Sequence, residues 1–184
     1  MLQRAGEGDL EEIAGVVNLA YRGAEGWTVE NGYIEGQRTS VEWLREEIAA
    51  KPEAMLLVWR EDGGGQVLGS VWLEPKGEGV WYLGMLNVRP AMQDRQLGRR
   101  LLAAAEEVAR ERGARRIRMT VVNVRETLIA WYERRGYRLT GEMEAFPYGD
   151  ERFGRPLRGD LSFVVLEKGD KEVSGPASRD QTRR

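Results

Sequence analysis

Short apolar runs and helical hydrophobic stripes alternate along this 184-residue chain. Apolar residues recur at helical spacing from Ile13 to Ala20 and from Leu101 to Ala109, which predicts two amphipathic helices. Further helices are predicted over residues 39–51 and 126–135. Short apolar runs bounded by turn residues predict seven strands, over residues 2–5, 54–60, 67–74, 80–88, 116–122, 137–143 and 161–167.

Polar residues predict where the helices begin. Asp9 with Glu12, and Thr39 with Glu42, have the spacing of capping boxes. The element order is strand, helix, helix, three strands, helix, strand, helix and two strands. Such an order predicts a mixed α/β fold, a sheet with helices on both faces.

The length is that of one domain, which we expect to span residues 1–168. Residues 169–184 are polar and lack apolar periodicity, which predicts a mobile tail. The predicted strand over residues 161–167 offers an exposed edge through which two copies can pair as a homodimer.

Charge and composition narrow the function classes. Lys and Arg number 28 against 30 Asp and Glu, a net charge of −2, which does not indicate nucleic-acid binding driven by overall charge. No apolar run approaches the roughly 20 residues that a membrane-spanning helix needs, and the N-terminus lacks the apolar core of a signal peptide. We therefore expect a cytoplasmic protein without a membrane partner.

The chain contains neither cysteine nor histidine. A thiolate nucleophile, a histidine-based triad and the common zinc sites are therefore excluded, and no metal site is predicted. Catalysis has to rely on carboxylates, Tyr, Lys, Arg, Ser or Thr, backbone dipoles or a cofactor. Direct attack of one bound reactant on another fits this set of groups.

The segment from Val80 to Leu102 carries the most specific signal. An apolar strand, Val80 to Val88, is stopped by Arg89-Pro90 and followed by a polar turn, Gln93 to Gly98, that leads into a helix. Free backbone N–H groups and the helix dipole meet in such a turn, which favours a phosphate or pyrophosphate ligand. The geometry alone names no ligand.

Two motifs resemble the signatures of the GNAT superfamily of N-acyltransferases. The turn ending in Leu97-Gly98-Arg99-Arg100 is similar to the family's (Arg/Gln)-x-x-Gly-x-(Gly/Ala) motif. Residues 131–137, WYERRGY, look like its second signature, a "-FYerlGF-" stretch. The resemblance runs from residue 2 to about residue 167. The segment GWTVENGYIEGQRT also resembles a small bacterial subgroup of the family whose substrates are mostly unassigned. The resemblance to the family implies a GNAT-like single domain with a twisted, mostly antiparallel sheet of six to seven strands and with acetyl-CoA as cofactor.

The resemblance also implies which residues contact the cofactor. They lie at the end of the central strand, in the turn, at the helix start and after the next strand: Leu86, Asn87, Val88, Gln93, Asp94, Arg95, Gln96, Leu97, Gly98, Arg99, Arg100 and Asn123. Asn87 either reaches the acyl arm or satisfies a bulge in the strand ladder. Gly84 can mark a splay that admits the cofactor arm between strands.

Three positions depart from the family pattern. Gln96 replaces the first glycine of the motif and can serve only if its φ is negative or mildly strained and its side chain points outward. Asp94 places a negative charge near an anionic ligand, which Arg95, Arg99 and Arg100 can offset. Arg125 stands seven residues before the helix tyrosine, where the family often has Asn.

In the GNAT mechanism an amine attacks the thioester carbonyl directly. The resemblance makes Tyr132 the candidate general acid for the departing thiolate; the alternative is core packing of the Trp131-Tyr132 pair. The family's strand glutamate is replaced by Tyr82. Glu30 and Glu35 are the next candidates for the base, the alternatives being a water chain or simple solvated carboxylates.

The glycine-rich loop from Gly23 to Arg38 is expected to lie over the acceptor site. Trp27, Glu30, Arg38 and Tyr82 are the candidate substrate-binding residues. Arg38 can hold a substrate carboxylate in a bidentate pair, and Trp27 either stacks on the acceptor or anchors the loop.

The leading hypothesis is acetyl transfer from acetyl-CoA to a primary amine of a small molecule. A protein or peptide acceptor is the first alternative, since the loops at 23–38 and 145–160 could cover a groove. A non-catalytic acyl-CoA-binding domain is the second, favoured by Gln96 and by the missing strand glutamate.

Overall fold

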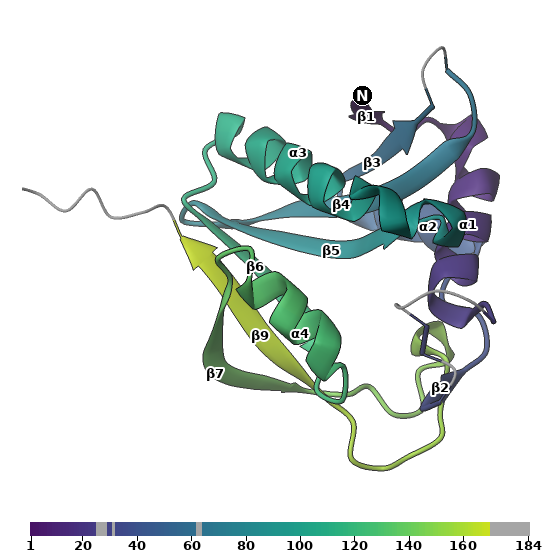
Figure 1. Cartoon of the computed structure of the whole chain (residues 1–184), viewed down its shortest axis with the longest axis vertical. Helices are drawn as coiled ribbons and strands as arrows, with labels where there is room; N and C mark the ends of the chain where they lie inside the picture. The colour runs from purple at the N-terminus through teal and green to yellow at the C-terminus, as the bar shows by residue number, and fades with distance from the viewer. Residues whose placement is uncertain (25–28, 31, 62–63, 170–184) are drawn as a thin grey trace, which may run out of the picture.

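Seven strands form one twisted sheet in the order β1-β3-β4-β5-β6-β9-β7 (Figure 1). The structure is a computed structural model that describes residues 1–24, 29–30, 32–61 and 64–169. The strands of this sheet are β1 (Leu2–Arg4), β3 (Met55–Arg60), β4 (Val67–Gly77), β5 (Val80–Val88), β6 (Arg116–Val122), β7 (Arg138–Ala145) and β9 (Ser162–Gly169). All neighbouring pairs are antiparallel except β5 with β6, which confirms the predicted fold class.

Four helices cover the two faces of the sheet (Figure 1). They are α1 (Leu10–Arg22), α2 (Val41–Ala50), α3 (Leu97–Glu111) and α4 (Glu126–Glu133). The side chains of β3 alternate between two cores: Leu56 and Val58 pack with α1 and α2, whereas Met55 and Leu57 pack with α3 and α4. In the part of the chain that the structure describes, no helix has both the length and the apolar character that crossing a bilayer requires.

Both predicted capping boxes differ from the structure. Ser40, not Thr39, is the N-cap of α2, and its hydroxyl accepts from the Trp43 N–H at 3.2 Å. Asp9 is the N-cap residue of α1, as predicted, but its carboxylate makes no cap hydrogen bond to α1 and instead accepts from the Gly6 N–H at 2.8 Å, across the short 3₁₀ turn η1 (Glu7–Asp9). In both cases the capping hydrogen bond moves within one turn, because several polar residues there compete for the same orphan amides.

The loops after α1 and after β7 pair with each other, which the sequence did not predict. β2 (Ile34–Glu35) and β8 (Arg155–Pro156) form a two-stranded antiparallel sheet. Ile34 is buried there with Phe146 and Leu161. Two-residue strands are too short for any hydrophobic period, so their pairing depends on this third small core.

The predicted open edge at residues 161–167 is wrong. β9 lies between β6 and β7 and pairs with both, so the edge of the sheet is β7. Connections of a sheet do not have to follow sequence order, and here the last strand is inserted beside β6. Of the predicted tail, only Gly169, the last residue of β9, lies within the described residues.

The one parallel pair of the sheet is short. β5 and β6 are in register only from Val80 to Tyr82 on β5, opposite Arg116 to Arg118 on β6. Beyond these residues the two strands diverge into a wedge (Figure 1). Pairing with β6 ends at Tyr82, two residues before Gly84, so the strands part where predicted; entry of the cofactor arm at this point stays a prediction.

A β-bulge shapes β5 within the wedge. Opposite β4, Trp72 pairs with Gly84 and Ser70 with Asn87, so two residues of β5 stand opposite the single residue between them on β4. Met85 accordingly has a φ of 48°, in the left-handed region. A bulge bends its strand, and this one lies just beyond the last residue of β5 that pairs with β6.

Candidate active site

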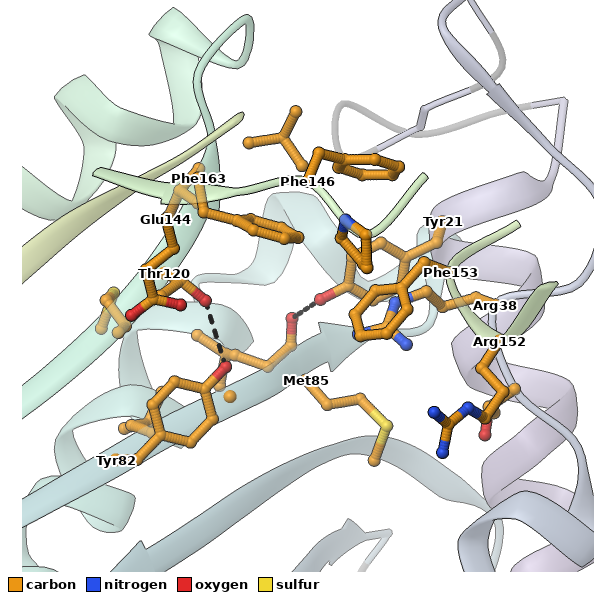
Figure 2. A pocket seen from close by; sticks show the side chains of 18 of the residues that line it. Tyr21, Arg38, Tyr82, Met85, Thr120, Glu144, Phe146, Arg152, Phe153 and Phe163 are labelled. Carbon is orange, nitrogen blue, oxygen red and sulfur yellow. Dashed lines mark hydrogen bonds between the residues drawn. The ribbon is translucent and has the colours of Figure 1, made fainter. Parts of the chain in front are cut away.

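A cavity of about 850 Å³ lies in and beside the wedge between β5 and β6 (Figure 2). Its walls come from β5, β6, the end of α1, α2, α4 and the paired loops. Four of the predicted catalytic and substrate residues line it together: Glu30, Arg38, Tyr82 and Tyr132. Trp27, the remaining predicted substrate residue, lies outside the described residues.

Tyr82 marks the narrow end of the wedge. Its hydroxyl and the Thr120 hydroxyl of β6 are hydrogen-bonded at 3.3 Å across the gap (Figure 2). A Cβ at position 84 would lie 2.6 Å from the Tyr82 ring. Glycine at position 84 therefore allows the Tyr82 ring to lie along β5 and reach β6.

The side chain of Asn87 forms hydrogen bonds within and across the bulge. Its side-chain amide donates to the Ser70 carbonyl at 3.2 Å, to the Ser70 hydroxyl at 2.7 Å and to the Met85 carbonyl at 2.8 Å. Asn87 is buried, and these bonds stabilise the left-handed residue Met85. Of the two interpretations offered by the sequence, the geometry fits the stabilised bulge; direct contact of Asn87 with the cofactor stays a prediction.

The backbone of Leu86 faces the cavity. The Arg89 N–H bonds to the Leu68 carbonyl of β4 at 2.8 Å, so by strand alternation Asn87 also faces β4 and Leu86 faces the other way. In agreement, the Leu86 carbonyl accepts from the Tyr21 hydroxyl at 3.2 Å, inside the cavity. The Leu86 N–H, on the same side of the strand, is available to an oxygen in the wedge.

The turn before α3 has the conformation that a glycine motif provides. After the 3₁₀ segment η2 (Pro90–Arg95), Gln96 has φ 57° and ψ 14°, left-handed, and its side chain is exposed. The strained, outward-pointing alternative is therefore the one realised. A left-handed residue that is not glycine carries a cost on the order of 1 kcal/mol or more.

The remaining residues of the predicted cofactor turn surround the start of α3. Leu97 and Val88 are buried, and Gly98 leaves room for both Val88 and Trp131, 3.7 and 3.8 Å from the position of a Cβ. Arg99 is exposed, and Arg100 lies over the Trp59 ring at 5.1 Å. Gln93, Asp94 and Arg95 have side chains outside the described part of the structure.

Two arginines at the end of α4, Arg134 and Arg135, join the predicted Arg99 in a cluster beside this turn and were not singled out by the sequence analysis. A second cavity, of about 500 Å³, lies between α3 and the end of α4 and includes Arg99, Arg134 and Arg135. Burial lowers the pKa of Arg135, and the neighbouring charges of Arg134 and Arg99 lower it further. This like-charge repulsion favours a bound anion next to the helix N-terminus.

Tyr132 both packs and lines the cavity. It is buried in α4, edge-on to Trp131 at 5.0 Å and to Tyr137 at 5.7 Å between ring centroids. Burial raises the pKa of Tyr132, so its hydroxyl keeps its proton throughout the neutral range. The packing interpretation and the hydrogen-bond donor role are therefore compatible in this structure.

Glu30 is held by two arginines. Its carboxylate pairs with Arg22 and, at 3.0 Å, with Arg125, and all three side chains are less than a tenth exposed. Burial alone would lower the pKa of Arg125, but the Glu30 carboxylate and Tyr21 outweigh it and the pKa is raised. The base role of Glu30 stays a prediction, and the two ion pairs make it less favourable because they occupy its oxygens.

The other polar candidates are placed elsewhere. Asn123 uses its amide to donate to the Asp160 carbonyl at 3.0 Å and to accept from the Ser162 N–H at 3.1 Å, which ties the end of β6 to β9. Glu35 forms an exposed pair with Arg155. Glu144 of β7, which the sequence analysis did not single out, does line the cavity (Figure 2).

Comparison with known proteins identifies relatives of this architecture. The model of the Acetyltransferase (GNAT) family matches residues 20–137. A mycothiol acetyltransferase from Beutenbergia cavernae is 35% identical over 83 residues, which are 44% of this chain but only 28% of that protein. The matched stretch thus spans little more than a quarter of that relative.

Solved structures of the same fold cover almost the whole chain. A ribosomal-protein-alanine N-acetyltransferase from Brucella melitensis superimposes with a TM-score of 0.67 at 19% identity, over 92% of this chain and 99% of its own. An IAA acetyltransferase from Bacillus cereus gives 0.62 at 18% identity, over 92% and 98%. At these identities the similarity concerns the fold.

Proposed function

Because this chain belongs to the GNAT acetyltransferase family, we propose that it transfers the acetyl group of acetyl-CoA directly to a primary amine of a small molecule. The observation that carries the proposal is the wedge between β5 and β6. It opens beside the left-handed turn at Gln96 and beside a cavity large enough for an acceptor.

The residues present fit coenzyme A. The first amides of α3 lack intrahelical partners and, together with Arg99, Arg134 and Arg135, suit its phosphate groups. The wedge suits the extended pantetheine arm, which brings the thioester to the bulge of β5. The carbonyl oxygen of the thioester can then accept from the Leu86 N–H, a donor that stabilises the developing oxyanion.

Acetyl transfer at this point would involve two bond changes. The neutral amine would form the N–C bond by attack on the thioester carbonyl, and the C–S bond would break as the thiolate leaves. Tyr132 donates a hydrogen bond to that thiolate; because its pKa is raised well above 10, it stabilises the charge rather than surrendering its proton completely. The proton lost by the amine passes to water or to a cavity carboxylate.

The paired loops favour a small acceptor over a protein segment. The pairing of β2 with β8 joins the loop after α1 to the loop after β7, and residues of both, including Ile34, Arg38 and Phe153, line one cavity. An open groove for an extended peptide would require these loops to lie apart. The family membership by itself supports acetyl transfer and leaves the acceptor open.

Transfer of labelled acetyl from acetyl-CoA tests the proposal. The purified protein is incubated with a panel of primary amines and, separately, with peptides that carry free N-termini and lysines. We expect labelled product with one or more small amines and with none of the peptides. Labelled peptide alone would replace the small-molecule acceptor with a protein acceptor, and calorimetric binding of coenzyme A without any labelled product would indicate a non-catalytic domain.

A further inference from the structure

Among the described residues around Tyr21, three arginines and one carboxylate come together at the acceptor end of the cavity. The guanidinium groups of Arg22, Arg38 and Arg125 gather near Tyr21, and both Arg38 and Arg125 lie over its ring, at 5.4 and 5.6 Å from the centroid. Arg22 and Arg125 share the carboxylate of Glu30. Three cations thus accompany one carboxylate in a partly buried site.

Arg38 is the cation of this group that no carboxylate accompanies. It is half-buried on the cavity wall, and among the described residues its guanidinium forms no ion pair and no hydrogen bond, only the stacking contact with Tyr21 (Figure 2). The five N–H donors of this guanidinium on the cavity wall therefore have no acceptor among the described residues. A guanidinium in such a place is strongly stabilised by a planar anion that accepts two of these donors.

The position of Arg38 is fixed from two sides. Its backbone N–H donates to the Asn18 side-chain oxygen at 2.6 Å, and the Asn18 amide donates to the Thr39 carbonyl at 2.8 Å. The ring on which it stacks is held in turn, because the Tyr21 hydroxyl donates to Leu86 at 3.2 Å. Arg38 is thus connected through the Tyr21 side chain to Leu86, whose N–H faces the wedge.

The other basic residues that line the cavity are paired with carboxylates: Lys51 and Lys76 with Glu74, and Arg152 with Asp150. Arg152 lies near Arg38 in Figure 2, but its guanidinium donates to both oxygens of Asp150, at 2.9 and 2.6 Å. Glu46 and Glu47 add further negative charge around Arg152. Among the described basic residues that line the cavity, Arg38 is therefore the one without an ion pair to a carboxylate.

We propose that the acceptor is an amine that also carries a carboxylate, as an amino acid does, and that Arg38 binds this carboxylate. The inference rests on the proposed function, because it names the acceptor class of the same site. With the carboxylate on Arg38, the amine of a short amino acid is directed toward Leu86 and the thioester. The negative charge of the acceptor's carboxylate also offsets the positive charge of the guanidinium groups at this end of the cavity.

The test compares acceptors that differ only in this charge. L-Amino acids and the matching L-amino amides are assayed with acetyl-CoA by thiol release, with wild type, Arg38→Gln and Arg38→Lys. For the best amino acid we expect kcat/KM at least about tenfold above that of its amide, and Arg38→Gln to lower the value for the acid by at least about tenfold, mainly through KM. The amide value should not change, and Arg38→Lys should restore part of the loss.

A matched arginine gives the control. Arg45 forms an exposed pair with Glu7 and does not line the cavity, so Arg45→Gln should leave the acid-to-amide ratio at the wild-type value. Amides that react as well as acids, or an Arg38→Gln variant that loses both acceptors equally, would overturn the carboxylate assignment while acetyl transfer stands. Absence of thiol release with every amine would overturn the proposed function and the acceptor class with it.

Discussion

The candidate site has two regions that are built from different parts of the chain. The proposed cofactor end consists of backbone features: the N-terminus of α3, the left-handed residue Gln96, and the bulge at Met85 that turns Leu86 toward the wedge. The acceptor end consists of side chains, above all the ion pairs of Glu30 with Arg22 and Arg125. Backbone features tolerate changes of side chain, as Gln96 illustrates, whereas the acceptor end depends on each individual charge.

Glu30→Gln, a change at the acceptor end, should have the largest effect on stability. The change leaves two arginines, less than a tenth exposed, without their carboxylate, which we expect to lower the free energy of unfolding by about 3–5 kcal/mol. Denaturant unfolding of the variant measures the loss. Glu35→Gln removes a similar carboxylate from an exposed pair with Arg155 and should have no measurable effect. Equal stabilities of the two variants would show that the buried pairs contribute nothing special.

Tyr132→Phe should separate packing from chemistry where the two ends meet. The ring contacts with Trp131 and Tyr137 are kept, so stability should stay close to that of the wild type, while kcat should fall about a hundredfold with little change in KM for acetyl-CoA. Tyr137→Phe is the matched control, since Tyr137 donates to Glu106 at 2.9 Å and does not line the cavity. That variant should lose stability and keep kcat. An unchanged kcat in Tyr132→Phe would leave packing as the only role of Tyr132.

Alkaline pH should weaken the fold through its buried tyrosines. Burial raises the pKa of Tyr21, Tyr132 and Tyr137 above 10, so in the folded protein they stay protonated where the unfolded chain ionises. The unfolded state then binds fewer protons, and the free energy of unfolding falls as the pH rises above about 10, by up to about 1.4 kcal/mol per pH unit for each tyrosine. Denaturant unfolding between pH 8 and 11.5 measures the slope. The slope should decrease in Tyr132→Phe, and a flat profile would contradict the assignment.

Gln96→Gly, a change at the proposed cofactor end, should have a smaller and favourable effect on stability and on binding of coenzyme A. Glycine adopts the left-handed conformation without strain, so we expect a gain of about 1 kcal/mol in stability and unchanged or tighter binding of coenzyme A by calorimetry. Gln96→Val places a β-branched residue at the same φ and should shift both quantities in the opposite direction. Identical behaviour of the two variants would mean that the backbone at residue 96 does not determine binding.

The sequence predicted what depends on local patterns. The seven strands, the four helices and the turn before Leu97 follow from periodicity and turn chemistry within short windows. The prediction of the sheet edge at residues 161–167 was wrong because strand order depends on pairing between distant segments. For the same reason nothing local indicates that β2 and β8 pair.

The candidate site shows the same contrast between local motifs, which the sequence predicted, and contacts between distant residues, which it did not. A motif of eight residues is enough to locate the left-handed turn before α3 that we propose binds the phosphates of coenzyme A, even with Gln96 in place of glycine. The acceptor end required Tyr21, Glu30, Arg38 and Arg125 to meet from positions more than 100 residues apart along the chain. Arg125 was noticed only as a departure from the family pattern, and its partner Glu30 only as a candidate base. Their ion pair could not be predicted, because it depends on how a long loop folds back onto α4.

The three-residue seam between β5 and β6 has a mechanical consequence. On either side of it the strands are joined by longer ladders, such as the seven pairs of β6 with β9, so each half of the sheet is stiff. We expect bending between the two halves to be concentrated at Val80–Tyr82, which acts as a hinge. A small rotation at this hinge changes the distance between β5 and β6 most at the open end of the wedge. A ligand bound in the wedge would contact both halves of the sheet and restrict this bending. Ligand binding and the rigidity of the domain are therefore coupled.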